Sequence, residues 1–458
     1  MLQAFANSFK IPDLRKKILF TFGIIAVYRL GTFIPTPGIN GAKLGVFFDN
    51  LARSSGGTLF GVMNLFSGGA IHRLTIFALG IMPYISSSII MQLLTVVIPQ
   101  LEKLAKEGGE IGRKQINQYT RYGTIVLSTI QSFFIALWLE NPAHFGGLEI
   151  VAFPGWGFRL LTVLTLTTGS TFIMWLGEQI QEKGIGNGMS LLVAAGIVSR
   201  IPTAISQIIS MMTPGSASRG QMDPLTIAIM LAVMVGAVIA VVLLTQGERK
   251  IPVQYPKRVV GRKIMGGQSV FIPFKVNNGG VMPIIFAQSI ILFPATIGVF
   301  LPNRFIQQMS QALSHGNPGY MAVMMFLIIF FSYFYTAIAF NPADVAENMK
   351  KYGGFIPGVR PGQPTAEYID FIINRVTLPG SIFLGLIAIA PELFGFLLKA
   401  AAGLQIPYQV ADFFGGTALL IVVGVALDTI KQIESQLLMR HYEGFMKRGR
   451  IKGRQRAA

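Results

Sequence analysis

The sequence of 458 residues contains no cysteine, which excludes disulfide bonds, thiol catalysis and thiolate metal sites. Its four histidines are scattered, and no two of them have the spacing of metal ligands. No Walker sequence is present, and no long hydrophobic run supplies a histidine that could activate a nucleophile. We therefore predict no catalytic residue, no metal site, no cofactor and no enzymatic activity.

Charged residues are also scarce, at 13% of the chain, whereas 52% of the residues are hydrophobic. A chain of this composition has more apolar surface than its own core can bury, so it is predicted to lie in a membrane. Acidic residues are the rarer sign, with 20 Asp and Glu against 38 Lys and Arg. The basic residues lie between the apolar runs rather than in one patch, which indicates membrane topology more than a nucleic-acid surface.

Ten apolar runs are long enough to cross about 30 Å of hydrocarbon. An even number places both termini on one side, and alternate loops put 29 of the 38 basic residues on that side. By the positive-inside rule both termini are cytoplasmic, as are the large loops 246–280 and 341–375. No cleavage pattern follows the first run, so it is predicted to be retained. The runs lie near 18–34, 74–98, 122–139, 158–177, 188–210, 224–246, 281–303, 317–340, 376–396 and 413–430.

Two stretches of the sequence match, GIMPYISSSII at 80–90 and GVMPIIFAQSI at 280–290. They begin the second and seventh runs, so a repeat would contain five spans and its second copy would enter the membrane from the opposite face. Five matches between two apolar sequences could arise by chance, but the two prolines also occupy the same position in corresponding runs. We predict an all-α, polytopic membrane protein of ten transmembrane helices in two inverted-repeat halves, 1–210 and 211–430, with a basic, disordered tail within 431–458.

Each matched stretch carries a proline, Pro83 or Pro283, inside an apolar run. In a helix interior, proline removes a hydrogen bond and displaces the carbonyl four residues earlier, which here belongs to Leu79 or Gly279. Lipid cannot satisfy a freed carbonyl, so such a span must face protein or a water-filled cavity. Ser86, Ser87 and Ser88 follow Pro83 in the first stretch, and Gln92 lies further along the same run. The two spans together predict an interface that opens.

The segment GGTLFGVMNLFSGGAIHR at 56–73 is apolar but too short to cross a membrane, and glycines bracket it. One interpretation is an interfacial helix lying on the membrane surface. The other is a re-entrant piece that folds into a cavity from the outer side and leaves it on glycine hinges. The sequence leaves both open.

Six strings give the chain a specific resemblance to the SecY family, the channel subunits of the bacterial protein translocase. The resemblance runs almost from end to end. The strings are NLFSGGAIHR, IFALGIMPYISSSIIMQLL, MWLGEQIQEKGIGNGMSLL, PFKVNNGGVMPIIFAQSI, FNPADVAENMKKYGGFIPGVRPG and FFGGTALLIVVGVALD.

The resemblance implies two halves hinged around a central hourglass pore, with an apolar ring at the neck, a plug segment over residues 57–70 and a lateral gate between spans 2 and 7. Met189 and Val193 depart from the isoleucine that the family favours in the ring. The implied ring is Ile81, Ile85, Met189, Val193, Ile285 and Ile421; the plug includes Gly57, Leu59, Phe60, Met63, Asn64, Phe66, Gly68 and Gly69; the gate includes Pro83, Ser87, Ser88, Gln92, Pro283 and Gln288.

The resemblance also implies partners. These are the small membrane subunits SecE and SecG, the SecA motor ATPase, the ribosome, signal peptides, unfolded preproteins and the lipid bilayer, here the bacterial inner membrane. Arg262, Lys263 and Arg360 match the family's positions for contact with the motor or ribosome. A charge pattern that only orients the protein in the membrane would explain these basic residues equally well.

Two other functions remain as alternatives. A secondary transporter for a small solute could be built from the same five-plus-five repeat, but acids are almost absent from the middle of the runs, where ion-coupled transporters usually place them. The few ionisable residues in or near the runs include Arg29, near the outer end of the first run, and residues at boundaries such as Arg121 and Asp428. A scaffold or insertase that binds ribosomes without a pore is the third possibility.

Overall fold

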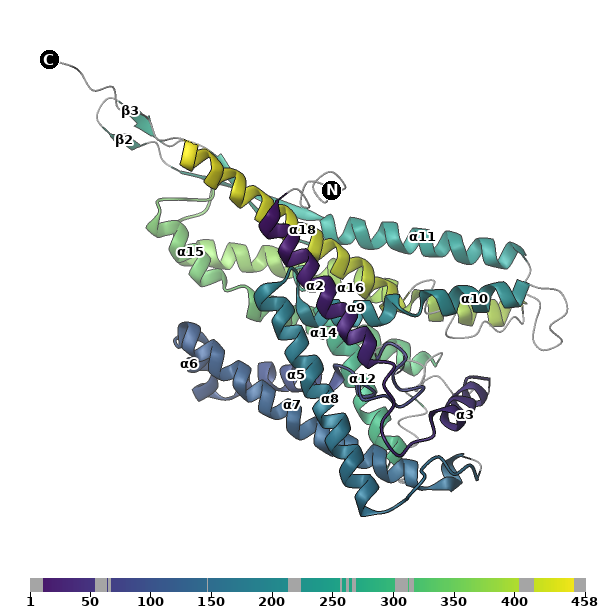
Figure 1. Ribbon diagram of the computed structural model, residues 1–458. Helices are drawn as coiled ribbons and strands as arrows, with labels where there is room; N and C mark the ends of the chain where they lie inside the picture. The colour runs from purple at the N-terminus through teal and green to yellow at the C-terminus, as the bar shows by residue number, and fades with distance from the viewer. Residues whose placement is uncertain are drawn as a thin grey trace.

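The computed structural model describes residues 11–53, 64, 67–145, 147–212, 224–255, 258–260, 263–265, 269–300, 312, 317–402 and 416–448. Nearly all the described elements are helices (Figure 1), which confirms the all-α prediction. The helices are α2 (Pro12–Gly31), α3 (Gly41–Arg53), α5 (Met82–Val97), α6 (Pro99–Lys106), α7 (Gly109–Glu140), η1 (Pro142–Phe145), α8 (Trp156–Lys183), α9 (Gly188–Val198), α10 (Ile201–Met212), α11 (Pro224–Gln246), α12 (Met282–Phe300), α14 (Pro318–Ala339), α15 (Pro342–Lys351), α16 (Gln363–Ala402) and α18 (Gly416–Arg448).

Helices occupy all ten of the predicted runs. Within the described residues, five helical segments are long and apolar enough to cross a membrane, and six if α5 and α6, bent by 100° relative to each other, form one span. Three shorter apolar helices cover Gly188–Thr203, Leu231–Gln246 and Met282–Leu292. The structure therefore confirms a polytopic membrane protein, whereas the number ten stays a prediction.

Two predicted boundaries are wrong. The run 188–210 is two helices, because α9 ends at Val198 and α10 begins with Pro202 in its first turn, a position that suits proline. The tail was expected to be disordered from Arg440, but α18 continues to Arg448. Residues 431–443 contain no glycine or proline and are rich in good helix formers, so the helix extends beyond its apolar part.

The start of α2 and the later half of α18 lie at the same end of the molecule. Leu14 and Ile18 of α2 form a small buried cluster with Ile185, in the turn between α8 and α9, and with Ile433 of α18. The Thr21 hydroxyl of α2 also accepts a hydrogen bond from the Ile185 backbone N–H at 3.1 Å. Both ends of the described chain therefore meet on one side, as the even number of predicted spans requires.

The two large loops at this end pack together as one unit, which we call the loop domain (residues 248–254, 269–275 and 342–373). Strands β1 (Glu248–Gln254) and β4 (Ser269–Lys275) pair antiparallel, and the short β2 (Arg258–Val260) and β3 (Lys263–Met265) extend the hairpin (Figure 1). Gln254 exchanges backbone hydrogen bonds of 2.9 and 3.0 Å with Phe355. The core of the loop domain comprises Ile251, Val253, Phe274, Met349, Ile356, Ile369, Ile372 and Ile373.

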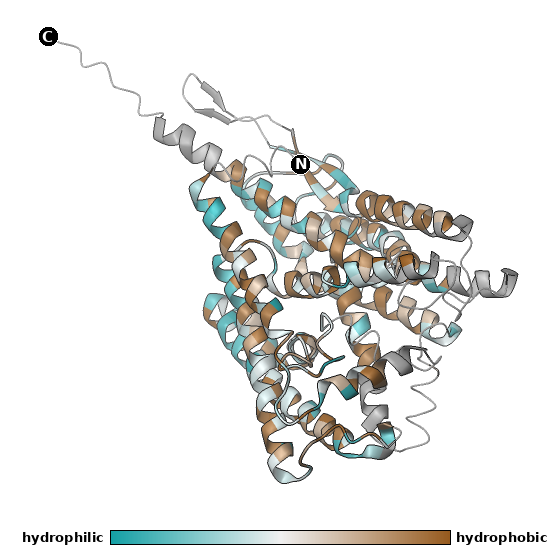
Figure 2. Ribbon diagram, turned by 45° about the vertical axis from the view of Figure 1, so that its right-hand side comes forward, coloured by the Kyte–Doolittle hydropathy of each residue, from teal (hydrophilic) through white to brown (hydrophobic). Residues whose placement is uncertain are grey.

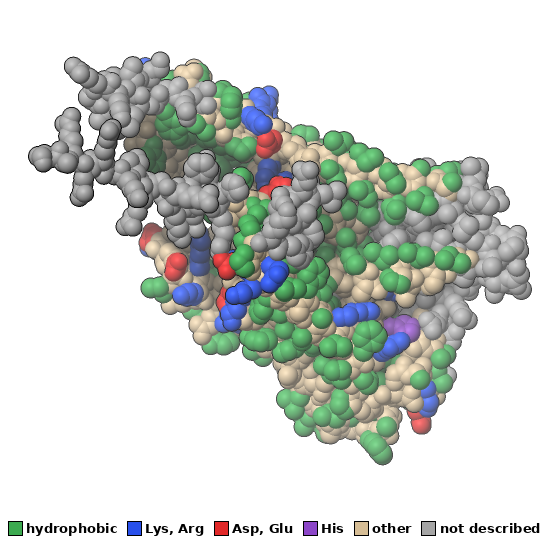
Figure 3. All heavy atoms as spheres, turned by 45° about the horizontal axis from the view of Figure 1, so that its top comes forward, with side chains coloured by type: hydrophobic (Ala, Val, Ile, Leu, Met, Phe, Trp, Pro, Cys, Tyr) green, Lys and Arg blue, Asp and Glu red, His purple; other side chains and the backbone are tan. Residues whose placement is uncertain are grey.

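The largest buried core lies between the helices of the two predicted halves. It contains side chains from α2, α5, α8 and α9 of the first half and from α11, α12, α14, α16 and α18 of the second. Hydrophobic residues also cover most of the outer faces of the helices (Figure 2) and much of the surface in Figure 3. Such an exterior fits a lipid environment.

Candidate pore and gate

The two matched stretches adopt the same local structure. Gly80 and Gly280 have φ angles of 58° and 59°, a left-handed conformation that favours glycine. Helices α5 and α12 then begin at Met82 and Met282, so Pro83 and Pro283 are second residues of their helices. The predicted interior kink is wrong, because a first-turn N–H has no partner within the helix and proline loses nothing there.

The span predicted from residue 74 starts late for a related reason. Residues 74–81 form turns rather than helix, and the backbone N–H of Gly80 donates to the carbonyl of Phe77 at 2.8 Å. Leu74 itself has a φ of 41°. An apolar sequence does not distinguish these turns from a buried helix, and the proline marks where the helix begins.

The surroundings of the two stretches match as well. The carbonyl of Ile76 lies against Gly169 of α8, and the carbonyl of Val276 lies against Gly380 of α16, so that a side chain at either glycine would collide with backbone. Helices α8 and α16 are the fourth predicted spans of the two halves. Similar tertiary contacts around both stretches support the inverted repeat.

All six predicted ring side chains belong to the one large buried core. They come from both halves, with Ile81, Ile85, Met189 and Val193 from the first and Ile285 and Ile421 from the second. Exposed fractions run from 0% for Ile421 to 7% for Met189, so the two residues that depart from isoleucine are as buried as the others. The structure therefore places all six residues in one buried core, and their arrangement as a ring stays a prediction.

Ile89 was missed in the sequence analysis. It continues the stripe of Ile81 and Ile85 one turn further along α5 and is 3% exposed in the same core. The spacing of four residues could have indicated it, since side chains four apart share a helix face.

Helices α5 and α12 pack directly against each other. The predicted gate residues, however, form their polar contacts within their own half. The Ser87 hydroxyl donates to the Thr120 carbonyl of α7 at 2.8 Å, and Gln288 accepts a hydrogen bond from the Tyr320 hydroxyl of α14 at 3.3 Å. Ser88 accepts a bond of 3.1 Å from Gln92 on its own helix.

The hydrogen bonds of Ser87, Ser88 and Gln288 thus remain within each half. Both helices contribute apolar side chains to the shared core, among them Ile85 and Ile285. Separating these helices would therefore break few polar contacts, a property suited to an interface that opens.

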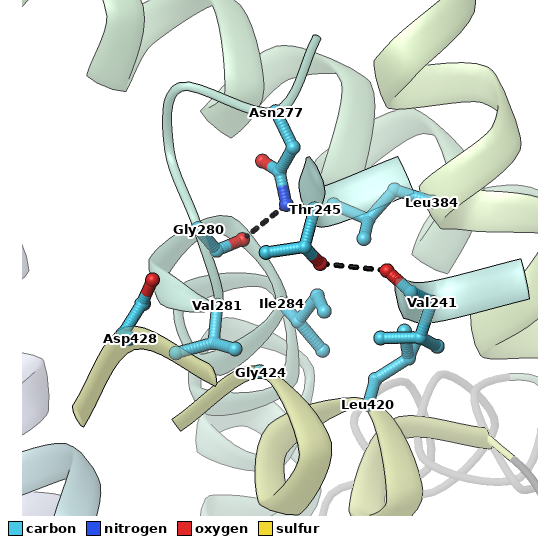
Figure 4. A pocket seen from close by; sticks show the side chains of 10 residues that line it. All are labelled: Val241, Thr245, Asn277, Gly280, Val281, Ile284, Leu384, Leu420, Gly424 and Asp428. Carbon is cyan, nitrogen blue, oxygen red and sulfur yellow. Dashed lines mark hydrogen bonds between the residues drawn. The ribbon is translucent and has the colours of Figure 1, made fainter. Parts of the chain in front are cut away.

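A small pocket lies beside the start of α12 (Figure 4). Asp428 of α18 approaches Gly280, and the Asn277 amide donates to the Gly280 carbonyl at 2.9 Å. Lys431 donates to the carbonyl of Thr245 in the last turn of α11 at 3.0 Å. Residues of α11, α12 and α18 thus meet around this pocket.

The plug prediction falls only partly within the described residues. Gly68 and Gly69 follow each other with φ angles of 66° and 90°, and the Asn64 carbonyl accepts a bond of 2.9 Å from the Gly69 N–H. The Arg29 guanidinium donates to the Gly68 carbonyl at 2.8 Å. Five plug residues lie outside the described part: Gly57, Leu59, Phe60, Met63 and Phe66.

The predicted contact residues lie at the end that holds the loop domain. Arg360 is exposed in the turn before α16, where its carbonyl accepts a bond of 2.7 Å from the Thr365 hydroxyl. Lys263 begins β3, and Arg262 lies outside the described residues. Among the described residues no group of His, Asp and Glu could hold a metal ion.

Comparison with known proteins gives one family. The SecY family model matches residues 75–430. A protein translocase subunit SecY from Streptomyces scabiei is 47% identical over 98% of this chain and 100% of the relative, and one from Aquifex aeolicus is 44% identical over 96% of this chain and 98% of the relative.

Solved structures share the fold at low identity. A protein-conducting channel is 16% identical with a TM-score of 0.65, and a SecY structure concerned with how the plug domain stabilises the closed channel is 17% identical with a TM-score of 0.60. Canine Sec61 in a ribosome–channel complex is 15% identical with a TM-score of 0.58. Each comparison covers 94% of both chains.

Proposed function

The chain belongs to the SecY family, and on this basis we propose that it is a protein-conducting channel. It passes unfolded polypeptides across the membrane and releases hydrophobic segments sideways into lipid. The observation that carries this proposal is the meeting of six apolar ring residues, from both halves of the chain, in one buried cluster. Translocase subunits SecY at 44% to 47% identity over almost the whole chain support it.

The apolar ring explains how such a channel excludes ions. Water is poorly held in a narrow apolar neck, so an ion meets a dewetting barrier there. A passing polypeptide fills the neck with its own atoms and replaces the ring contacts of Ile85, Ile285 and Ile421. In the closed state that we propose, these side chains fill the neck themselves, and the predicted plug closes its outer side.

The contact between α5 and α12 is the proposed lateral gate. A hydrophobic segment that leaves through it gains roughly 25 cal/mol for each Å² of apolar surface removed from water. Because the described contacts between α5 and α12 are apolar, the segment replaces apolar contacts by similar ones. Pro83 and Pro283 serve this gate by fixing where its helices begin.

The energy comes from partners, and the chain itself catalyses no reaction. The SecA motor and the ribosome dock on the loop domain and its hairpin tip, through Arg262, Lys263 and Arg360, while SecE and SecG clamp the two halves, residues 1–210 and 211–430. Signal peptides and unfolded preproteins are the cargo. The protein lies in the bacterial plasma membrane with both termini cytoplasmic, in keeping with its basic residues. Solved neighbours with this fold include ribosome-bound channels.

The solute transporter is not favoured, because the relatives are translocase subunits and the neck is lined by aliphatic side chains rather than ion ligands. The substitutions Ile85→Asn and Ile285→Asn test the pore. In planar bilayers or proteoliposomes, both should increase ion leak, because a polar lining holds water in the neck. Ile90→Asn is the matched control, since Ile90 is 45% exposed on the same helix. Unchanged leak in both ring variants would exclude the pore.

A further inference from the structure

Arg29 is a charged residue near the end of the predicted first span, and its contacts are neutral. Its guanidinium lies 4.8 Å from the ring centre of Phe33 and donates to the Thr32 hydroxyl at 3.3 Å. None of the ion pairs between described residues includes Arg29. A cation near the C-terminus of α2 interacts favourably with the helix dipole. The dipole does not explain, however, why the side chain points in the direction that it does.

That direction is set by Gly68, 39 residues further along the chain. The bond of 2.8 Å from Arg29 Nη1 to the Gly68 carbonyl is shorter than the bond of 3.3 Å from the same nitrogen to the Thr32 hydroxyl. Charged donors form stronger hydrogen bonds than neutral ones, and a partly buried site strengthens them further. Arg29 therefore ties α2 to the last residues of the proposed plug.

Gly68 also packs against α9. A side chain built on Gly68 would lie 3.1 Å from the Cα of Gly196, and one built on Gly196 would lie 3.3 Å from the backbone nitrogen of Gly68. Gly196 follows Met189 and Val193 of the ring at positions that share one face of α9. Gly68 thus contacts α9 one helical turn from the predicted ring residue Val193, and a Cβ on Gly68 would also lie 3.7 Å from Arg29 Nη1.

The chain around Gly68 is a compact turn, which we call the plug root (Asn64 and residues 67–72). Asn64 accepts backbone hydrogen bonds from Gly69, at 2.9 Å, and from His72, at 3.2 Å. The Ser67 hydroxyl accepts a further bond of 3.4 Å from the Ile71 N–H. A force on Gly68 is therefore transmitted to the whole plug root.

We propose that Arg29 is a positioning residue that latches the plug root onto α9 while the ring is closed. The inference rests on the proposed channel function. Because Gly196 shares a helix face with Met189 and Val193, any outward movement of α9 that opens the ring removes the seat of Gly68. The Arg29 bond holds the plug root in this seat, so it favours the closed state and links release of the plug root to opening of the ring.

The absence of cysteine from the natural chain allows a direct test, because a single introduced thiol reports without background. Ser67 is 2% exposed, so Ser67→Cys should react slowly with a membrane-impermeant maleimide added from the outer side. In that background Arg29→Ala should increase the labelling rate and the ion leak about tenfold, the effect expected for loss of a charge-assisted hydrogen bond. Arg29→Lys keeps a cationic donor and should restore part of the protection.

Arg73→Ala is the matched control. The Arg73 guanidinium lies over the same Phe33 ring, at 5.8 Å, so its removal changes the local charge and stacking but leaves the bond to Gly68 intact. Labelling and leak should stay at the parental level. Gly196→Val adds a side chain where α9 contacts Gly68, so it should increase both the labelling rate and the ion leak with Arg29 in place.

Parental labelling and leak in Arg29→Ala would overturn the latch, as would an equal rise in Arg73→Ala. If Arg29→Ala does not accumulate in membranes, Arg29→Lys and Gly196→Val decide the question by the same two measurements. The ring variant Ile85→Asn keeps the two proposals separate. If Ile85→Asn leaks ions and Arg29→Ala does not, only the latch is excluded. If neither variant leaks ions, the channel function is excluded.

Discussion

Gly80 and Gly280 turn the chain in the same left-handed conformation, with φ angles of 58° and 59°, at the starts of the two gate helices. A residue with a Cβ is disfavoured there by about 1–2 kcal/mol. We therefore expect Gly80→Ala and Gly280→Ala each to lower the free energy of unfolding by about that amount, measured by thermal unfolding in detergent. Gly280→Ala should be the worse, because its Cβ would lie 3.2 Å from the Asp428 carboxylate.

Gly23→Ala is the control for these two variants. Gly23 lies within α2, and a Cβ there would meet nothing within 4 Å. Alanine should leave the stability unchanged or raise it, because it is the better helix former. Equal loss in all three variants would show that the left-handed conformation is not the cause.

Gly169 and Gly380 are expected to be intolerant of even one methyl group. In Gly169→Ala the new carbon would occupy the space of the Ile76 carbonyl, and in Gly380→Ala that of Val276. Overpacking of this kind costs about 1–3 kcal/mol. Both variants should unfold at lower temperature and leak ions, because displacing either segment moves a gate helix and with it Ile85 or Ile285.

The α11 variant Gly236→Ala should do neither, since a Cβ on Gly236 meets nothing within 4 Å. If only one of Gly169→Ala and Gly380→Ala is affected, the two contacts do not have the same role. The structural match between the halves would then be limited to the matched stretches themselves.

The sequence was sufficient to predict the membrane environment and the position of each gate helix, because both depend on composition and on a repeated string. It did not show that Pro83 begins a helix. That depends on residues 74–81 forming turns against α8, and their apolar side chains suit a buried turn and a buried helix equally. Local sequence therefore placed the proline in the right element but gave it the wrong role.

The direction in which individual side chains point was even harder to predict from the sequence. The family resemblance implied Ser87 as a gate residue, but only the fold showed that its hydroxyl bonds to Thr120 on α7. The ring members Met189 and Ile421 came from the family resemblance, since spacing alone does not reveal which helices meet. For Arg29, a charge within an apolar run indicates that a partner exists. The identity of that partner, a carbonyl 39 residues away, required the fold.

Ser87 and Ser88 provide a test of packing against gating. Ser87→Ala removes a buried hydrogen bond to the Thr120 carbonyl and should destabilise the protein by about 1 kcal/mol, measured by thermal unfolding in detergent. Ser88→Ala removes only a half-buried contact with Gln92 on the same helix and should have a smaller effect. A larger loss in Ser88→Ala would contradict the assignment of Ser87 to the contact between α5 and α7.

The loop domain should bind its partners as one body, so a substitution in its core should act at a distance from the contact surface. Val253 is 1% exposed, and Val253→Asp would bury an unpaired carboxylate. The hairpin should then separate from α15 and α16, and affinity for the motor or ribosome should fall while the ion leak stays low. Val270→Asp is the control, because Val270 lies opposite Val253 on β4 but is 48% exposed.

If Arg360 contacts the ribosome directly, its substitution should affect binding differently from disruption of the loop domain. Arg360→Glu removes an exposed cation and should weaken ribosome binding, and the dependence of log affinity on log salt should become shallower by about 1 because one phosphate contact is lost. Lys43→Glu, at the opposite end of the molecule where Lys43 donates to the Glu149 carbonyl, should change neither quantity. Sedimentation binding over a series of salt concentrations measures both. If the salt dependence is unchanged in Arg360→Glu, Arg360 acts only in orienting the protein in the membrane. Val253→Asp would still test the loop domain in that case.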